Sequence, residues 1–484
     1  MPNKNHSRLI GRTFIGRGPV LRSLLLFLFT FILAGISVSP LAGNDKWVQP
    51  ERSALEKTPD AMPFYPSRAS TQGRHLTPEM FDSAETCRGC HQEIYRQWQG
   101  SAMAQAWIDP IYQALLQRAS EATDAKVDNF CIGCHSPIGM TAYNTTPADF
   151  RKPFTPPGVS CEVCHNISAV SGNDNGAYVL TPSDNGKRVK FGPHRDAPSP
   201  YHESNYSELL TKSEFCAVCH NVSHPFNSTP IERTYDEWSE SAYNEQGIQC
   251  QDCHMTPGPG VTINPGKSAP MGKQRDHIAS HHFTGGNVTL HKHFGQPEMA
   301  ERARNMLRSA ATIEVLTPKQ SLLGGELATI KVKVSNVGAG HKIPTGFPEG
   351  REMWVDFKVT DSRGNLIYRS GAIRNGQTES GTRNFKVYLG DKHNDVVELN
   401  VWEVDRVLAD TRILPKGYAI VDYTFTIPTG IQGPLLLNAD LNYWPFSQKL
   451  VDELLGPGKI EVEVVRMTSV TQSLAVQLQL AQKQ

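Results

Sequence analysis

Ten cysteines and five histidines of this 484-residue chain follow one pattern, Cys-x-x-Cys-His, which recurs five times between residues 87 and 254. The motifs are Cys87, Cys90 and His91; Cys131, Cys134 and His135; Cys161, Cys164 and His165; Cys216, Cys219 and His220; and Cys250, Cys253 and His254. Two thiols at this spacing can form thioethers with the two vinyl groups of one haem, and the following imidazole can then bind the iron. The pattern therefore predicts five covalently bound haem c groups, attached through the cysteines and ligated by the histidines.

A Cys-x-x-Cys pair can also be half of a zinc site or a redox disulfide, but neither requires a histidine at the next position. Only 17 of the 484 residues are histidine, so composition does not explain a histidine after all five pairs. The pattern favours haem attachment over both alternatives.

The segments around the motifs resemble the multihaem cytochromes related to cytochrome c554, from about Phe81 to Asp361. The resemblance rests on Cys-Arg-Gly-Cys-His-Gln-Glu-Ile-Tyr with Trp-Gln-Gly-Ser, Cys-Ile-Gly-Cys-His, Gly-Val-Ser-Cys-Glu-Val-Cys-His, Tyr-Asp-Glu-Trp before Cys-Gln-Asp-Cys-His-Met, and the later His-His-Phe-Thr-Gly-Gly-Asn and Gly-His-Lys-Ile-Pro-Thr-Gly. It implies haems stacked closely enough to exchange electrons, and irons that mostly bind two histidines. Such iron has no open position for a substrate, so we expect an electron carrier and no catalytic residue.

Sixth iron ligands must come from outside the motifs, where eleven histidines remain once His6 in the N-terminal segment is set aside. His194 and His202 resemble a ligand-bearing loop of the family. A cluster that is dense for ordinary composition follows the last motif, and His281 is our first choice from it; the cluster is His277, His281, His282, His291 and His293. His224 lies four residues after a motif histidine and fits a loop residue instead.

Two further ligands are hypotheses. In related sequences the Trp-x-x-Ser-x stretch is often followed by histidine, whereas here Met103 follows it, and a thioether ligand would raise the potential of one haem. Packing within a helix is an equally good interpretation of Met103. The second hypothesis concerns His341, whose glycine- and proline-rich loop interrupts a strand pattern and can present one side chain rigidly.

The N-terminal residues 1–43 are typical of a secretory signal, with arginines before an apolar run at Leu24–Ile36. That run only approaches the roughly 20 residues that span a bilayer, so cleavage is favoured over a membrane anchor. Export to the periplasm or the cell exterior follows, a compartment that suits covalent haem attachment. Acidic and basic residues number 48 each, so nothing indicates a nucleic acid partner.

The remaining chain divides by composition. Residues 44–80 are predicted to form an extended arm, and residues 81–307 a haem domain of short helices, with helical patterns at Gln92–Ala106 and Ile111–Ala122. A weak echo, in which Tyr95, Trp98, Ser101 and Ala102 match the spacing of Tyr235, Trp238, Ser241 and Ala242, indicates either a duplication or two similar helices.

From about Ala311 alternating residues predict strands, so residues 308–466 should form an antiparallel β-sandwich, and the fold class is α+β. The predicted strands lie at 327–334, 353–360, 396–404, 418–427 and 435–443, and the tail 467–484 is left unassigned, because helical and alternating patterns both fit it.

Two functions follow. The favoured one is a pentahaem carrier between a quinol-linked or periplasmic donor and an unknown acceptor. The alternative is a reductase or oxidase of nitrogen or sulfur oxyanions with one five-coordinate haem, although all five motifs end in histidine and none in lysine. Peripheral membrane association and assembly into an oligomer or filament both stay open.

Overall fold

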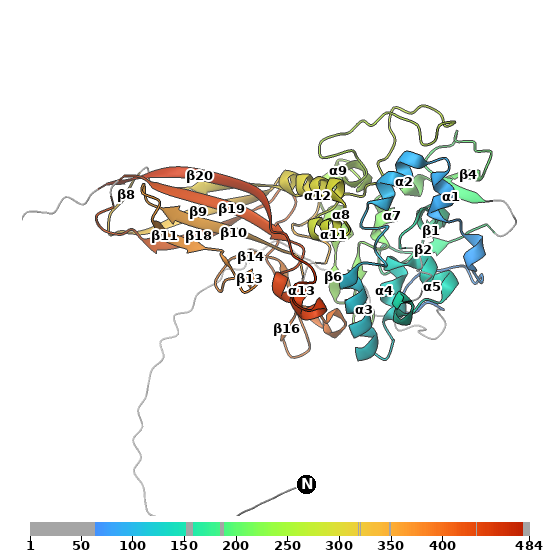
Figure 1. The fold of residues 1–484 in the computed structure, drawn as a ribbon, viewed down its shortest axis with the longest axis horizontal. Helices are drawn as coiled ribbons and strands as arrows, with labels where there is room; N and C mark the ends of the chain where they lie inside the picture. Colours follow the sequence, from blue (N-terminus) through green and yellow to red (C-terminus); the bar gives the residue numbers. More distant parts are fainter. Residues whose placement is uncertain are drawn as a thin grey trace, which may run out of the picture. The chain divides into compact units, whose positions relative to one another are not determined.

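The structure is a computed structural model that describes residues 63–151, 158–183, 188–317, 319, 321–347, 350–431 and 433–477. It confirms the predicted α+β class, with helices in the first part of the chain and strands in the second (Figure 1). The predicted signal and the start of the arm, up to residue 62, lie outside the described residues. No helix in the described ranges is long and apolar enough to cross a membrane.

Short helices and two-stranded pairs make up residues 63–310, which we call the helical part. The helices are η3 Pro78–Met80, α1 Ala84–Arg88, α2 Gln92–Gln99, α3 Pro110–Ala122, α4 Asp128–His135, α5 Pro137–Tyr143, η4 Pro147–Arg151, α6 Cys161–Asn166, η5 Glu208–Thr211, α7 Glu214–Ala217, α8 Thr234–Ser239, α9 Ala242–Glu245, α10 Gln251–His254, α11 Val288–His293 and α12 Pro297–Ala310. The strand pairs are β1 Ile167–Val170 with β2 Tyr178–Leu180, β3 Val189–Gly192 with β4 Glu203–Tyr206, and β5 Val222–Ser223 with β6 Pro230–Glu232.

The two predicted helical stretches end differently. Helix α3 matches its prediction because Pro110 begins it and the Asp109 carboxylate accepts hydrogen bonds from the N–H groups of Ile111 and Tyr112. Helix α2, by contrast, ends at Gln99 and not at the predicted Ala106, because Gly100 caps it and turns follow. The prediction of one long helix after the first motif is therefore wrong in its second half.

Residues 63–80, which were predicted to form an extended arm, consist of turns and helix η3, and Ser70 forms a bridge to strand β2. The N–H of Ser70 donates to the carbonyl of Tyr178, and the N–H of Leu180 donates back to Ser70. This part of the predicted arm therefore packs along strand β2.

Strands dominate residues 311–477, which we call the β domain. They are β7 Ala311–Leu316, β8 Ser321–Leu323, β9 Leu327–Asn336, β10 Glu352–Thr360, β11 Leu366–Ser370, β12 Ile373–Arg374, β13 Gln377–Thr378, β14 Asn384–Phe385, β15 Val387–Gly390, β16 Val396–Val397, β17 Arg406–Asp410, β18 Tyr418–Thr426, β19 Leu435–Trp444 and β20 Val465–Gln477, with helices η6 Val401–Glu403 and α13 Gln448–Leu455.

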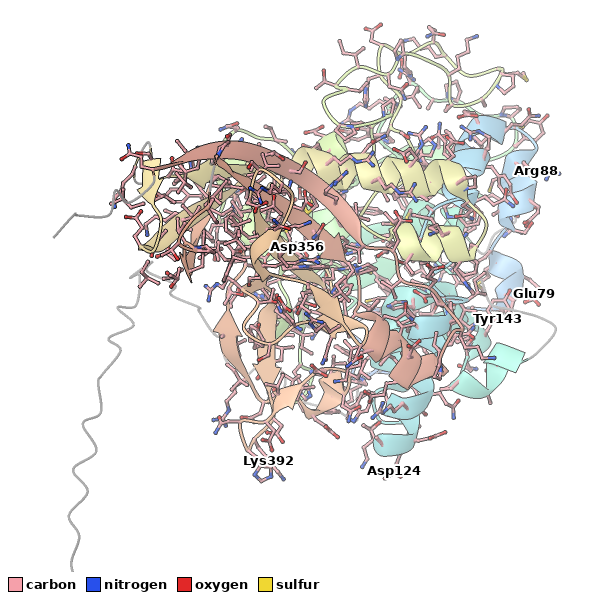
Figure 2. The ribbon with its side chains drawn as sticks, turned by 60° about the vertical axis from the view of Figure 1, so that its left-hand side comes forward. Glu79, Arg88, Asp124, Tyr143, Asp356 and Lys392 are labelled. Carbon is pink, nitrogen blue, oxygen red and sulfur yellow. The ribbon has the colours of Figure 1, made fainter. Side chains whose placement is uncertain are left out.

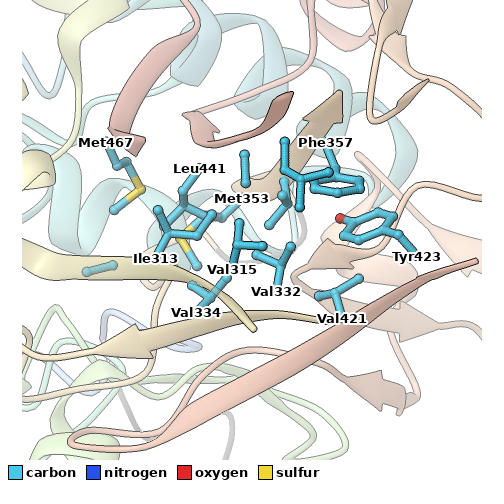
Figure 3. Close-up of a cluster of buried hydrophobic side chains, with 14 of the residues drawn as sticks. Ile313, Val315, Val332, Val334, Met353, Phe357, Val421, Tyr423, Leu441 and Met467 are labelled. Atoms are coloured by element: carbon cyan, nitrogen blue, oxygen red, sulfur yellow. The ribbon is translucent and has the colours of Figure 1, made fainter. Parts of the chain in front are cut away.

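Two sheets supply one shared core, as in a sandwich. One has the order β18-β9-β7 and the other β11-β10-β19-β20-β8. Alternate residues of both sheets enter a single buried cluster, in which Val332 and Tyr423 of the first sheet meet Phe357 and Leu441 of the second (Figure 3). Burying these apolar faces is the main force that holds the β domain together.

Three details differ from the sequence interpretation. The predicted strand at 396–404 is wrong, because the chain forms only β16 and then the turn of helix η6. The unassigned segment after Arg466 continues strand β20 as far as Gln477, and Leu474 points into the core. Strand β20 pairs with β8 in parallel, so this sheet is not purely antiparallel.

A small sheet of β16, β15 and β17 connects the β domain to the helical part. Its apolar residues, Val387, Leu389, Val397 and Val404, form one buried cluster with Ile231 of β6. Lys392 lies at the tip of its β15–β16 turn, and Asp124 lies just beyond the end of α3 (Figure 2). The two parts therefore pack together through buried apolar side chains.

Candidate functional site

Each Cys-x-x-Cys-His motif is folded as one helical turn. The second and third motifs lie inside helices α4 and α6, and in the others the histidine N–H donates to the carbonyl of the first cysteine, at 2.8 Å for His91, 3.0 Å for His220 and 2.9 Å for His254. Positions i, i+3 and i+4 share one face of a helix. Both thiols and the imidazole of each motif therefore face the same side.

The Nδ1 atoms of four motif histidines lie within hydrogen-bonding distance of backbone carbonyls. The distances are 2.7 Å from His91 to Ser268, 3.1 Å from His135 to Ala106, 2.6 Å from His165 to Phe191 and 2.6 Å from His254 to Thr284. When Nδ1 donates its hydrogen, the other nitrogen, Nε2, keeps its lone pair for a metal. The four rings are therefore held as metal ligands are.

The fifth motif histidine, His220, has a different neighbour. Its Nδ1 lies 3.6 Å from a carboxylate oxygen of Glu232, which is longer than a hydrogen bond. Burial lowers the pKa of His220, but Glu232, Cys134 and Cys250 together raise it more, and the net shift is upward. A carboxylate beside a ligating imidazole makes that imidazole a stronger donor.

Residues of all five motifs line one cavity of about 2480 Å³. A pocket for a single ligand measures about 300–1,000 Å³, so this volume suits several large groups. Its wall holds all ten cysteines, all five motif histidines and many apolar side chains, together with five cationic residues that suit propionates, namely Arg188, Lys190, Lys273, Arg275 and Arg351. All ten cysteines are free thiols. In composition and size, the cavity fits covalently attached haem groups.

Two pairs of imidazoles face each other across the cavity. The ring centroids of His91 and His202 are 6.4 Å apart at an interplanar angle of 27°, and those of His254 and His341 are 6.2 Å apart at 19°. With metal–nitrogen bonds of about 2.0 Å and ring centres about 1.1 Å behind each nitrogen, two opposite imidazoles on one metal would be about 6.2 Å apart. Both pairs have the separation that one iron between them requires.

His281, the first choice from the histidine cluster, also lines the cavity. Its Nδ1 lies 3.0 Å from the carbonyl of Ala279. Burial lowers the pKa of His281 to about 4, and burial does the same for His341. Both imidazoles are therefore neutral at pH 7 and can offer a lone pair to a metal.

Met103 and His194 also lie on the cavity wall. The carbonyl of Met103 accepts hydrogen bonds from Ala106 at 3.2 Å and from Val159 at 3.0 Å, which places its backbone beside the second and third motifs. His194 is partly exposed, and in the described part of the chain no hydrogen bond fixes its ring. Both residues stay predictions as ligands.

The remaining histidines of the cluster divide clearly. His291 is buried on the cavity wall with its Nδ1 3.3 Å from Gln296 Oε1, so it is a candidate ligand that the sequence did not single out. The only signal for it was membership of the dense cluster. His277 also lines the cavity, whereas His293 and His282, which is near Glu298, are not on its wall. Outside the cluster, His224 uses both ring nitrogens in contacts with Trp402 and Phe226.

Thiols of different motifs touch one another. Cys87 and Cys161, Cys134 and Cys219, and Cys216 and Cys250 lie close enough for one thiol of each pair to shift the pKa of the other. The attachment sites of the first and third motifs, of the second and fourth, and of the fourth and fifth are therefore neighbours.

The helical part and the overall fold both have known counterparts. Residues 86–166 match the family model of cytochrome c554 and c-prime. The fold is similar to a penta-haem cytochrome c552 from Thermochromatium tepidum, with 20% identity, a TM-score of 0.58, and coverage of 82% of this chain and 100% of that one. The CARDB domain of a Pyrococcus furiosus protein matches 34% of this chain and 86% of its own, with 15% identity and a TM-score of 0.17. None of the curated proteins matches.

Proposed function

We propose that this chain, a multihaem c-type cytochrome with a C-terminal β domain, binds five covalent haem c groups and relays electrons between redox partner proteins. The observation that carries the proposal is that two motif histidines each face a second imidazole: His91 faces His202, and His254 faces His341. Iron between two imidazoles has no position for a substrate and changes only its oxidation state. Such sites suit a carrier better than a catalyst.

The protein's own residues would hold the haems, orient their ligands and keep water away. Thioethers would attach each haem through two cysteines, and the carbonyls beside the motif histidines fix those rings. Burial lowers the pKa of the two facing histidines, His202 and His341, which favours their neutral form. Bound haem supplies the one-electron chemistry of its iron.

The thiol contacts suggest an order for the relay that differs from the order in sequence. The first site adjoins the third, and the fourth adjoins the fifth and the second. Cys164 of the third motif also lies close enough to Cys216 of the fourth to raise its pKa, although the neighbouring Cys250 thiol and burial raise it more. We infer a path through sites one, three, four and five, with site two as a branch at site four.

Secretion to the periplasm or the cell exterior belongs to the same proposal, because the predicted signal at residues 1–43 supports it. A quinol-linked or periplasmic donor is the partner class that such a location implies. Intact mass of the purified holoprotein tests the haem count. We expect the processed chain plus five haems, and a count of four or fewer would contradict the assignment of all five motifs.

One observation favours the second candidate, a reductase or oxidase with an open haem. Glu232 sits beside His220, and a carboxylate at this position strengthens the donor and stabilises oxidised iron. Among the described residues, the imidazole pairs at the axial separation involve His91 and His254, so His220 shares the lack of such a partner with His135 and His165. The carboxylate of Glu232 is therefore what makes the haem of His220 the first at which an open position should be sought.

A further inference from the structure

The sequence similarity between Tyr95–Trp98 and Tyr235–Trp238 is also a structural similarity. The first pair lies on helix α2 and the second on α8. Their rings are 5.7 Å apart at 53° in α2 and 5.5 Å apart at 42° in α8. The N–H of Ser101 donates to the carbonyl of Trp98 at 2.8 Å, and that of Ser241 donates to Trp238 at 2.9 Å. The two helices therefore share their local geometry.

Each tryptophan also holds a haem-attachment motif at the same place. Trp98 Nε1 donates to the carbonyl of Val159 at 2.8 Å, and Trp238 Nε1 donates to the carbonyl of Ile248 at 2.9 Å. Val159 lies two residues before Cys161, and Ile248 lies two residues before Cys250. Two helices that merely resemble each other would have no reason to share this contact.

The residue before each tryptophan holds a different segment, one that carries a histidine outside the motifs. Gln97 Oε1 accepts a hydrogen bond from the backbone N–H of His281 at 2.8 Å. Glu237 Oε2 accepts one from the backbone N–H of Lys342, the residue after His341, at 3.2 Å, and another from the Thr345 hydroxyl at 3.1 Å. Each helix therefore forms hydrogen bonds with the segment before one motif and with one distant loop that carries a histidine.

We propose that the chain contains two duplicated haem modules. Each module consists of one helix, α2 or α8, the attachment motif that its tryptophan binds, and the histidine loop that the residue before the tryptophan binds. By this correspondence His281 is the sixth ligand of the haem on Cys161 and Cys164. In the α8 module, the motif histidine is His254 and the loop histidine is His341, and their ring centroids are 6.2 Å apart. The equivalent pair in the α2 module is His165 and His281. Gln97 and Glu237 are positioning residues: their hydrogen bonds to the backbone fix the loops that carry the sixth ligands. The inference rests on the proposed haem binding.

The positioning residue differs between the modules for a local reason. Glu237 forms an ion pair of 2.7 Å with Arg412, and the side chains are only 2% and 4% exposed. A buried guanidinium needs a carboxylate partner. The charged group that contacts Gln97 is instead the exposed carboxylate of Glu93, which accepts a hydrogen bond from Gln97 Nε2 at 2.9 Å, so a neutral amide suits this position. Gln97 is therefore the better position for a test, because its replacement strands no buried charge.

The test compares variants of the holoprotein by low-temperature EPR of the oxidised form. His281→Ala should convert one low-spin signal to high-spin. Gln97→Leu should shift the g values of that same signal and speed the binding of added imidazole to that haem, while His341→Ala should change a different signal. The matched control is Gln99→Leu, on the exposed side of the same helix, which should leave all signals as in the parent.

Two outcomes would overturn the inference. One is an unchanged set of signals in both His281→Ala and Gln97→Leu; the other is a change at the haem that His341→Ala affects. If His281→Ala does not accumulate, the comparison of Gln97→Leu with Gln99→Leu still decides, because neither variant removes a ligand and only Gln97→Leu should shift that signal. Failure of the haem proposal would look different, since the intact mass would then lack haems.

Discussion

The imidazoles of His254 and His341 face each other with centroids 6.2 Å apart and planes 19° from parallel, although one belongs to the helical part and the other to the β domain. The loop that carries His341 is fixed on both sides. Asn336 Nδ2 donates to the carbonyl of His341 at 2.9 Å, and Glu237 accepts from the next residue. If both rings bind one iron, the β domain completes a haem site of the helical part.

Replacing His341 with alanine should therefore remove one axial ligand and leave the other four haems intact. We expect one bis-histidine low-spin signal to disappear from the EPR spectrum and a high-spin signal, or one from an added ligand, to replace it. His393→Ala, a change of the same kind on an Asp391–Asp395 turn of the β domain, is the control. Five unchanged signals in His341→Ala would remove this residue from the ligands.

Met103 can be tested through its effect on potential. Imidazole stabilises ferric iron better than a thioether does, so Met103→His should lower the potential of one haem in a redox titration. Met103→Leu, which has no donor atom, should instead expose that haem to added ligands. Five unaltered potentials in Met103→His would show that Met103 packs in the site without binding iron.

The carboxylate of Glu232 should tune the haem of His220. Its negative charge favours the more positive ferric state, so Glu232→Gln should raise one potential in the titration while preserving side-chain size. Glu208→Gln, at an exposed ion pair with Lys212, should leave all potentials unchanged. A fall or no change in Glu232→Gln would contradict this role.

The buried ion network at the junction of the two parts should matter for stability. Arg412 bridges Glu237 and Asp410 with 4% of its side chain exposed, and Lys342 pairs with the same aspartate. Removing one member strands buried charge, so Arg412→Leu should destabilise the holoprotein by about 3–5 kcal/mol. Arg406→Leu, at an exposed pair with Asp405, should cost at most about 1 kcal/mol. Thermal melts of both variants would compare them, and equal melting temperatures would rule out a special role for the network.

The parts of the fold that the sequence could predict are those that depend on the spacing of residues close together in the chain. The Cys-x-x-Cys-His motifs form one helical turn each, and strict alternation located β9, β10, β18 and β19 almost to the residue. Alternation reports burial, however, and not pairing. Val397 and Val404 are both buried, yet the chain between them forms a turn, which is why the strand expected there is wrong.

Contacts between distant segments were the hardest features to predict. Gln97 and His281 are 184 residues apart, and nothing local to Gln97 marks it as a positioning residue. His291 was likewise hidden, because a histidine on a short helix is an ordinary surface residue until the fold turns it toward a cavity. The resemblance to known multihaem cytochromes, together with the loop sequence, pointed to His202 and His341, whose rings do face motif histidines.

The most direct measurement of the central claim is low-temperature EPR of the fully oxidised holoprotein without added ligands. An electron carrier whose irons all have two protein ligands predicts five low-spin ferric haems and no high-spin signal. A stoichiometric high-spin ferric haem would contradict the carrier and identify an open site for a substrate.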